Sequence, residues 1–142
     1  VQTKSVVLGA PDELSLYAGE SYWTGNSSAL RRYTLRLDGF VSIHAPMSGG
    51  QLVTKLLTFT GKQLHLNFAT SAAGSVRVEI LDDQGKPIPG YTIDDSSEVF
   101  GDAIDRVVTW KSGSDVSALS GRPIQLRFEL TDADLYALRF GE

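Results

Sequence analysis

Apolar and polar residues alternate at period two in short segments along most of this chain, and this pattern limits the fold more than any other feature. In residues 31–46, Tyr33, Leu35 and Leu37 share one phase, and a second alternating run follows the Asp-Gly pair at Asp38. Two alternating runs joined by Asp-Gly are typical of a β-hairpin with one face packed on the core and one face exposed to solvent. We therefore expect residues 31–46 to form a β-hairpin.

The same alternation recurs to the end of the chain, separated by turn-forming residues. Beside the two hairpin arms, the expected strands are residues 4–8, 13–18, 51–59, 62–70, 75–81, 106–110, 122–130 and 133–140, with a short one near 90–93 and one helical turn at 115–119. About ten short strands at this spacing predict an all-β fold, a two-sheet antiparallel β-sandwich. The expected core residues are Leu35, Leu37, Val41, Ile43, Leu64, Leu66, Phe68, Val76, Val78, Ile80, Leu126, Phe128, Leu130 and Phe140, with Trp110 also buried.

Composition narrows the class of protein. With 142 residues and 42% hydrophobic content, the chain is expected to form a single domain, residues 1–142, around one core. The net charge of -4 argues against nucleic acid or an anionic membrane as partner, since either needs a basic surface. The absence of cysteine excludes disulfides, thiol catalysis and thiolate metal sites. The apolar stretches are too short for a membrane span.

Three long segments carry a family resemblance: RYTLRLDGFVSIHAP (32–46), LVTKLLTFTGKQLHLNFATSAAGSVRVEILDDQGKPIPGY (52–91), and the run from GDAID to ALRF (101–140). Together they resemble the C-terminal β-sandwich module of bacterial secreted glycoside hydrolases that have propeller-type catalytic domains. The resemblance implies a jelly-roll-like or concanavalin-like sandwich in an extracellular or periplasmic setting. It also implies an accessory role in polysaccharide breakdown, as a carbohydrate-binding module.

A sugar-binding site needs an aromatic ring against the C–H face of the sugar, with planar donors and acceptors that reach its hydroxyl groups. Residues 19–30 form a Gly-, Asn- and Ser-rich loop that contains two adjacent aromatic residues. The alternative for these aromatics is that one of them closes the end of the core. The predicted carbohydrate-binding residues are Tyr22, Trp23, Asn26, Arg31, Arg32 and, more distantly, Asp102.

Residues 94–105 carry five carboxylates in an irregular, acidic segment. Calcium takes oxygen ligands of this kind in loops, although the spacing does not follow an EF-hand. A solvated acidic loop without metal is the alternative. The candidate ligands for a structural calcium ion are Asp94, Asp95 and Asp102, with Asp132 and Asp134, which otherwise fit a turn, as a second set.

The two histidines, His44 and His65, lie in the polar phase of their strands, so we expect both at the surface and neither in catalysis. One polar sheet face is expected to contain His65, Asn67, Arg77, Glu79, Arg127 and Glu129. Mixed charges on one face suit cross-strand ion pairs, and such a face is also one along which a glycan chain can lie.

The resulting expectation is a non-catalytic module that binds a polysaccharide or oligosaccharide and is attached to, or adjacent to, a polysaccharide-degrading catalytic domain. A structural sandwich that packs on and stabilises the catalytic domain is the alternative, and it predicts a broad apolar outer patch. The third alternative is a small glycosidase, for which Glu98 and Asp102 are the only carboxylate pair that we nominate.

Overall fold

The computed structural model describes residues 12–21, 25 and 28–142 of the chain, and these residues form an all-β protein with antiparallel sheets. The chain divides into two compact units, Val1–Val41 and Ser42–Glu142, which are described one at a time. The described part holds seven strands and one 3-10 turn, η1 (Ser117–Leu119). The antiparallel β class is therefore confirmed, whereas the expected ten strands and the two-sheet sandwich are not.

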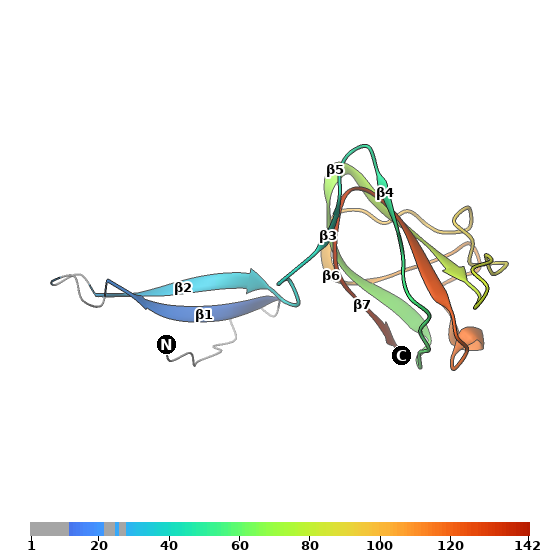
Figure 1. Ribbon diagram of the computed structural model, residues 1–142, viewed down its shortest axis with the longest axis horizontal. Helices are drawn as coiled ribbons and strands as arrows, with labels where there is room; N and C mark the ends of the chain where they lie inside the picture. The colour runs from blue at the N-terminus through green and yellow to red at the C-terminus, as the bar shows by residue number, and fades with distance from the viewer. Residues whose placement is uncertain (1–11, 22–24, 26–27) are drawn as a thin grey trace. The chain divides into compact units, whose positions relative to one another are not determined.

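The first unit contains a two-stranded sheet of β1 (Glu13–Glu20) and β2 (Ala29–Arg36) (Figure 1). The two strands are antiparallel and pair over eight residues, from Glu13 opposite Arg36 to Glu20 opposite Ala29. The predicted hairpin at residues 31–46 is therefore wrong, because its first arm pairs with β1. The Asp-Gly turn does form, since Asp38 has a φ of 54° and Gly39 N–H donates to the Arg36 carbonyl. The expected strand at residues 4–8 lies outside the described residues.

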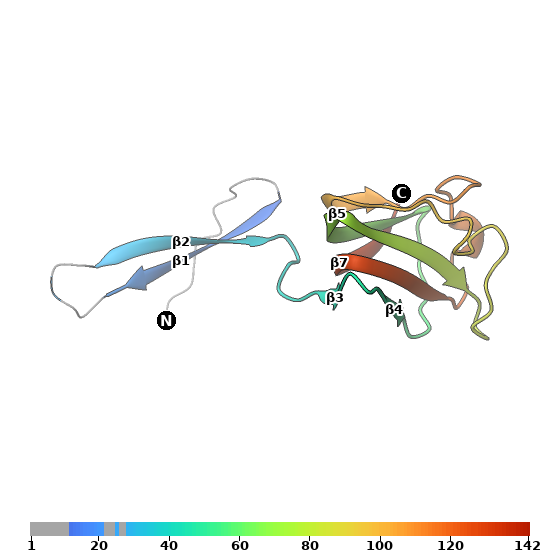
Figure 2. The same ribbon diagram turned by 90° about the horizontal axis from the view of Figure 1, so that it is seen from above.

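The second unit is built on one strongly curled sheet of five strands, in which two long strands, β5 and β7, run side by side (Figures 1 and 2). The strand order is β3–β7–β5–β6, and β4 also pairs with β7. The five strands are β3 (Ile43–Ala45), β4 (Gly50–Val53), β5 (Gln63–Leu81), β6 (Asp102–Val107) and β7 (Gln125–Gly141).

The curl comes from irregularities in the pairing of β5 with β7. The register shifts between Thr70 and Ser75, where the backbone at Gly74 lies so close to β7 that a Cβ there would meet the Asp132 carbonyl oxygen at 2.4 Å. The strands expected separately on either side of this point are therefore one long bent strand. The last two expected strands likewise merge into β7, which lowers the strand count.

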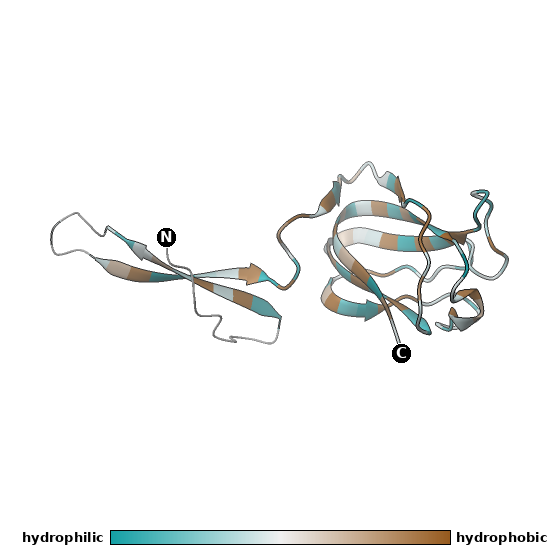
Figure 3. Cartoon of the chain, turned by 60° about the horizontal axis from the view of Figure 1, so that its bottom comes forward, coloured by the Kyte–Doolittle hydropathy of each residue, from teal (hydrophilic) through white to brown (hydrophobic). Residues whose placement is uncertain are grey.

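The core lies on the inward face of this sheet, where apolar residues recur at every second position (Figure 3). Nine predicted core residues are buried: Leu64, Leu66, Phe68, Val76, Val78, Ile80, Leu126, Phe128 and Leu130. Trp110 is buried as predicted, Phe140 packs on the core, and Leu35 and Leu37 are half-buried in the first unit. The predictions for Val41 and Ile43 are wrong, because both side chains are exposed. Ile43 lies in a three-residue edge strand, which buries little of its length.

One edge of β5 is covered by an irregular segment, residues 86–99, instead of a strand. The N–H of Ile80 donates to the Tyr91 carbonyl and the N–H of Val78 donates to the Ser96 hydroxyl, while Val76 exchanges two backbone hydrogen bonds with Val99. The Trp110 indole N–H completes this edge by donating to the Val78 carbonyl at 2.9 Å. The backbone groups of this half of β5 are thereby satisfied without a further strand.

Candidate functional site

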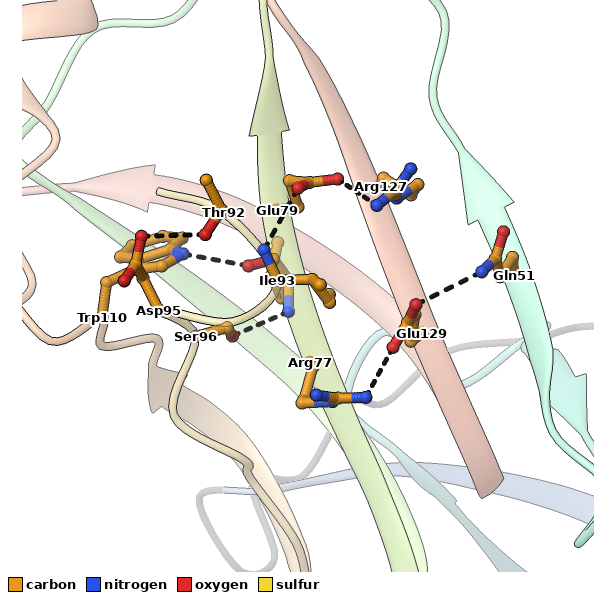
Figure 4. Close-up of polar contacts among 11 residues, drawn as sticks. Gln51, Arg77, Glu79, Thr92, Ile93, Asp95, Ser96, Trp110, Arg127 and Glu129 are labelled. Atoms are coloured by element: carbon orange, nitrogen blue, oxygen red, sulfur yellow. Dashed lines mark hydrogen bonds and ion pairs between the residues drawn. The ribbon is translucent and has the colours of Figure 1, made fainter. Parts of the chain in front are cut away.

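The outward face of the curled sheet carries a row of charged and polar side chains that we call the charged ladder: Arg77 and Glu79 on β5, Arg127 and Glu129 on β7, and Gln51 on β4 (Figure 4). The register sets Arg77 opposite Glu129 and Glu79 opposite Arg127, so each cation faces an anion on the neighbouring strand. The expected cross-strand ion pairs on this face are confirmed.

The exposed half of the ladder joins three strands. An Arg77 guanidinium nitrogen lies 2.7 Å from Glu129 Oε2, and the Gln51 amide donates to Glu129 Oε1 at 3.3 Å. The Arg77 side chain is 40% exposed and the Glu129 side chain 27% exposed. These three planar groups therefore hold one another in place and remain open to solvent.

The other half of the ladder is closed to solvent at its carboxylate, although its arginine, Arg127, is 30% exposed. Glu79 is only 2% exposed, its Oε2 lies 2.5 Å from an Arg127 guanidinium nitrogen, and its Oε1 accepts the backbone N–H of Ile93 at 3.1 Å. A buried carboxylate needs this pairing, because an uncompensated charge in the interior is strongly destabilising. The Glu79 carboxylate therefore ties Ile93 to the sheet and is itself not open to a ligand.

A second polar cluster spans β6, β5 and β7. Asp105 accepts two hydrogen bonds from Arg139, at 2.7 and 2.8 Å, and lies 2.8 Å from His65 Nδ1. Burial acts to raise the pKa of the Asp105 carboxyl, but the Arg139 hydrogen bond and the nearby His65 outweigh it and hold that pKa below the usual value. The cluster fixes an ionised carboxylate across three strands.

His65 is buried, so the prediction that both histidines lie at the surface is correct for His44 alone. His65 Nδ1 faces Asp105 and Arg139, and its Nε2 is buried with no hydrogen-bond partner among the described residues. Through these contacts His65 joins β5 to Asp105 on β6 and Arg139 on β7.

The acidic segment has its own internal contacts. Asp95 accepts a hydrogen bond from the Thr92 hydroxyl at 2.8 Å and lies 3.4 Å from Lys111, and these contacts lower the pKa of its carboxyl. Asp94 is exposed, and Asp102 opens β6 at the surface. Among the described residues, no set of three acidic or histidine side chains is placed to hold a metal ion. Calcium binding therefore stays a prediction.

The predicted carbohydrate-binding loop is described only in part. Tyr22, Trp23 and Asn26 lie outside the described residues. Arg31 and Arg32 are adjacent on β2, where successive side chains point to opposite faces, so these two arginines do not line one surface.

Both arginines already have partners on β1. Arg31 lies 2.9 Å from Glu20, while Arg32 lies 3.6 Å from Glu13 and donates to the Ser15 hydroxyl at 3.1 Å. In this structure, the two arginines thus join β2 to β1.

Sequence reasoning missed two exposed aromatic residues, Phe40 and Phe100. Phe100 is 66% exposed, directly before Gly101, whose φ of 100° turns the chain into β6. Two hydrogen bonds hold Gly101 to Thr70 of β5: the Gly101 N–H donates to the Thr70 hydroxyl, and the Thr70 N–H donates to the Gly101 carbonyl. The alternation signal marks residues inside strands and says nothing of a turn such as this one.

Comparison with known proteins identified no relative of this chain. No family model, no curated protein and no solved structure matches this chain. No helix in the described part of the chain is long and apolar enough to cross a membrane.

Proposed function

We propose that this chain is a non-catalytic, jelly-roll-like accessory module that binds a polysaccharide beside a polysaccharide-degrading catalytic domain, outside the cell or in the periplasm. The observation that carries the proposal is the exposed half of the charged ladder. It sets a guanidinium, a carboxylate and an amide in one row across three strands.

This row matches the chemistry of a sugar. Each sugar hydroxyl donates one hydrogen bond and accepts others, so it pairs well with neighbouring donors and acceptors. Arg77 and Gln51 supply donors and Glu129 supplies an acceptor, all on a rigid sheet. Because these side chains already restrain one another, binding orders them at little further entropic cost.

Stacking on an aromatic ring is the second part of the proposed mechanism. Tyr22 and Trp23 remain the proposed platform, and Phe100 is a further exposed ring that the structure describes. Contacts of this kind to a single sugar segment imply a Kd on the order of micromolar to millimolar. Tethering to a catalytic domain then raises the effective concentration on the polymer.

Affinity electrophoresis of the whole chain in gels that contain different plant and microbial polysaccharides tests the proposal. Gln51→Ala is the sharpest ladder variant, because it removes an exposed amide and leaves the Arg77–Glu129 pair intact. Gln84→Ala, at an exposed turn, is its matched control. We expect at least one polysaccharide to retard the protein, and Gln51→Ala to weaken that retardation while Gln84→Ala does not.

Trp23→Ala in the same gels separates the two parts of the mechanism. If Trp23→Ala alone abolishes retardation, the loop is the binding site and the ladder is structural. If no polysaccharide retards the wild-type chain, the carbohydrate proposal is wrong.

The alternative role, packing against a neighbouring domain, is favoured by one observation. Several large apolar side chains are exposed, among them Leu30, Phe40 and Val41, the last 77% exposed. A contiguous exposed apolar patch marks a protein contact site, and Phe40 and Val41 are neighbours in the chain. An apolar fluorescent dye tests this alternative. If the surface is a docking face, the dye is expected to bind the wild-type chain and to bind a Phe40→Ser, Val41→Ser double variant of unchanged stability less well. An equal dye signal from the wild type and the double variant argues against a docking face.

A further inference from the structure

The two-stranded sheet of the first unit has strand edges that nothing in the described part of the chain covers. Among the described residues, β1 and β2 pair only with each other. Each strand therefore turns one row of backbone N–H and C=O groups away from its partner, and such a row is a template for a further strand. The second unit differs, because there residues 86–99 cover the free edge of β5.

One face of this sheet also carries apolar side chains that are partly exposed to solvent. The register sets Leu14 opposite Leu35 and Leu16 opposite Tyr33, so these four side chains share one face. Leu16 is 41% and Tyr33 45% exposed. A two-stranded sheet by itself is marginally stable in water, and a third strand with its own apolar residues extends this face.

Charge selects the kind of strand that fits. β2 carries Arg31, Arg32 and Arg36 and no acidic residue, whereas β1 carries Glu13 and Glu20 and no basic residue. The side chains of Arg31 and Arg32 stay exposed although they pair with β1. A symmetric dimer through the β2 edge brings the arginines of two copies together, which is destabilising. Pairing of the acidic β1 edge of one copy with the β2 edge of the next matches the charges but is head-to-tail, so it builds an open filament unless it closes into a ring. An acidic strand of a different polypeptide therefore suits the β2 edge better than a second copy of this chain.

We propose that the outer edge of β2 is a strand-addition site for an extended acidic segment of another polypeptide, with apolar residues alternating between its carboxylates. Backbone hydrogen bonds give such an interaction its affinity, and the alternating side chains give it specificity. On the face opposite Tyr33, carboxylates of the added strand lie beside Arg32 and Arg36, while its apolar residues extend the Leu16–Tyr33 face.

Amide hydrogen exchange of the whole chain, followed by NMR, tests the proposal with synthetic peptides. The probe is an alternating Glu-Val peptide of the same length as β2, which has eight residues. The controls are an alternating Lys-Val peptide and a Glu-Val peptide with N-methylated backbone, which lacks the N–H groups for pairing. We expect a Kd on the order of millimolar. When the Glu-Val peptide is present at about ten times this Kd, hydrogen exchange at alternate amides of β2 is expected to slow by about tenfold. Neither control peptide is expected to change the exchange rate.

Charge reversal gives an independent readout. The double variant Arg32→Glu, Arg36→Glu changes the two arginines on the face opposite Tyr33 and is expected to prefer the Lys-Val peptide. If that variant loses the β1–β2 sheet, the comparison of the peptides on the wild-type chain still decides. Three results overturn the proposal: no slowing by Glu-Val peptide, equal slowing by Lys-Val peptide, or a dimer in sedimentation with β2 protected. None of these depends on whether the chain binds a polysaccharide.

Discussion

The buried pair of Glu79 and Arg127 makes the sharpest prediction about stability. Glu79→Gln keeps a side-chain oxygen for the Ile93 N–H and removes only the negative charge that faces Arg127. Removing one partner of a fully buried ion pair costs about 3–5 kcal/mol, and the 30% exposure of the Arg127 side chain reduces this to about 2–3 kcal/mol. For a unit of this size the midpoint of thermal unfolding is expected to fall by about 10–20 °C.

Urea unfolding at pH 7 measures this cost, with Glu129→Gln as the matched control. Glu129 makes the same kind of cross-strand pair with Arg77, but both side chains of that pair are partly exposed, and its loss is expected to cost less than about 1 kcal/mol. The double variant Glu79→Gln, Arg127→Met removes both charges and is expected to recover most of the lost stability. If Glu79→Gln and Glu129→Gln cost the same, burial does not set the strength of these pairs and the reasoning is refuted.

Three further predictions concern the second unit. Burial raises the pKa of Asp105, but the Arg139 hydrogen bond outweighs this and holds the pKa below its usual value of about 3.9. The Asp105 carboxylate is half-exposed, so its ionised form contributes less than about 1 kcal/mol of stability. Because its pKa is lowered in the folded state, this contribution is present above about pH 4 and is lost as the pH falls through the lowered pKa. Urea curves of Asp105→Asn and wild type are therefore expected to differ at pH 7 and to converge near pH 2. Gly74→Ala places a Cβ against two carbonyl oxygens of β7 and is expected to lower the stability measured by thermal unfolding by about 1–3 kcal/mol. Gly19→Ala, whose Cβ meets nothing within 4 Å, is expected to cost little. Equal losses for the two variants would contradict the steric argument. Trp110→Phe removes a buried hydrogen bond to a β5 carbonyl and is expected to cost about 1–3 kcal/mol in urea unfolding, and an unchanged midpoint would contradict this.

The alternation of the sequence determined most of the core by itself. Leu64, Leu66 and Phe68, with Val76, Val78 and the inward residues of β7, are buried where the pattern placed them. This works because successive side chains of a strand point to opposite faces, so the phase of the apolar residues decides which face turns inward. The same rule grouped the charges of the ladder on one outward face.

Strand pairing is where the sequence fails. The turn at Asp38 and Gly39 forms locally, yet β2 pairs with β1 and β3 pairs with β7. Backbone hydrogen bonds are the same for every residue, so an alternating run does not encode its neighbour. The same limit explains why Ala73 and Gly74, which fit a turn, lie instead within one continuous bent strand.

The candidate site shows the same division. The sequence determined that Arg77, Glu79, Arg127 and Glu129 share a face, because this follows from phase alone. Only the tertiary structure decided that Glu79 is buried beneath residues 92–96 while Glu129 stays open to solvent, and that Asp105 joins His65 across two strands. Burial depends on which distant segment covers a side chain, and that depends on how the whole sheet curls, which no local pattern contains.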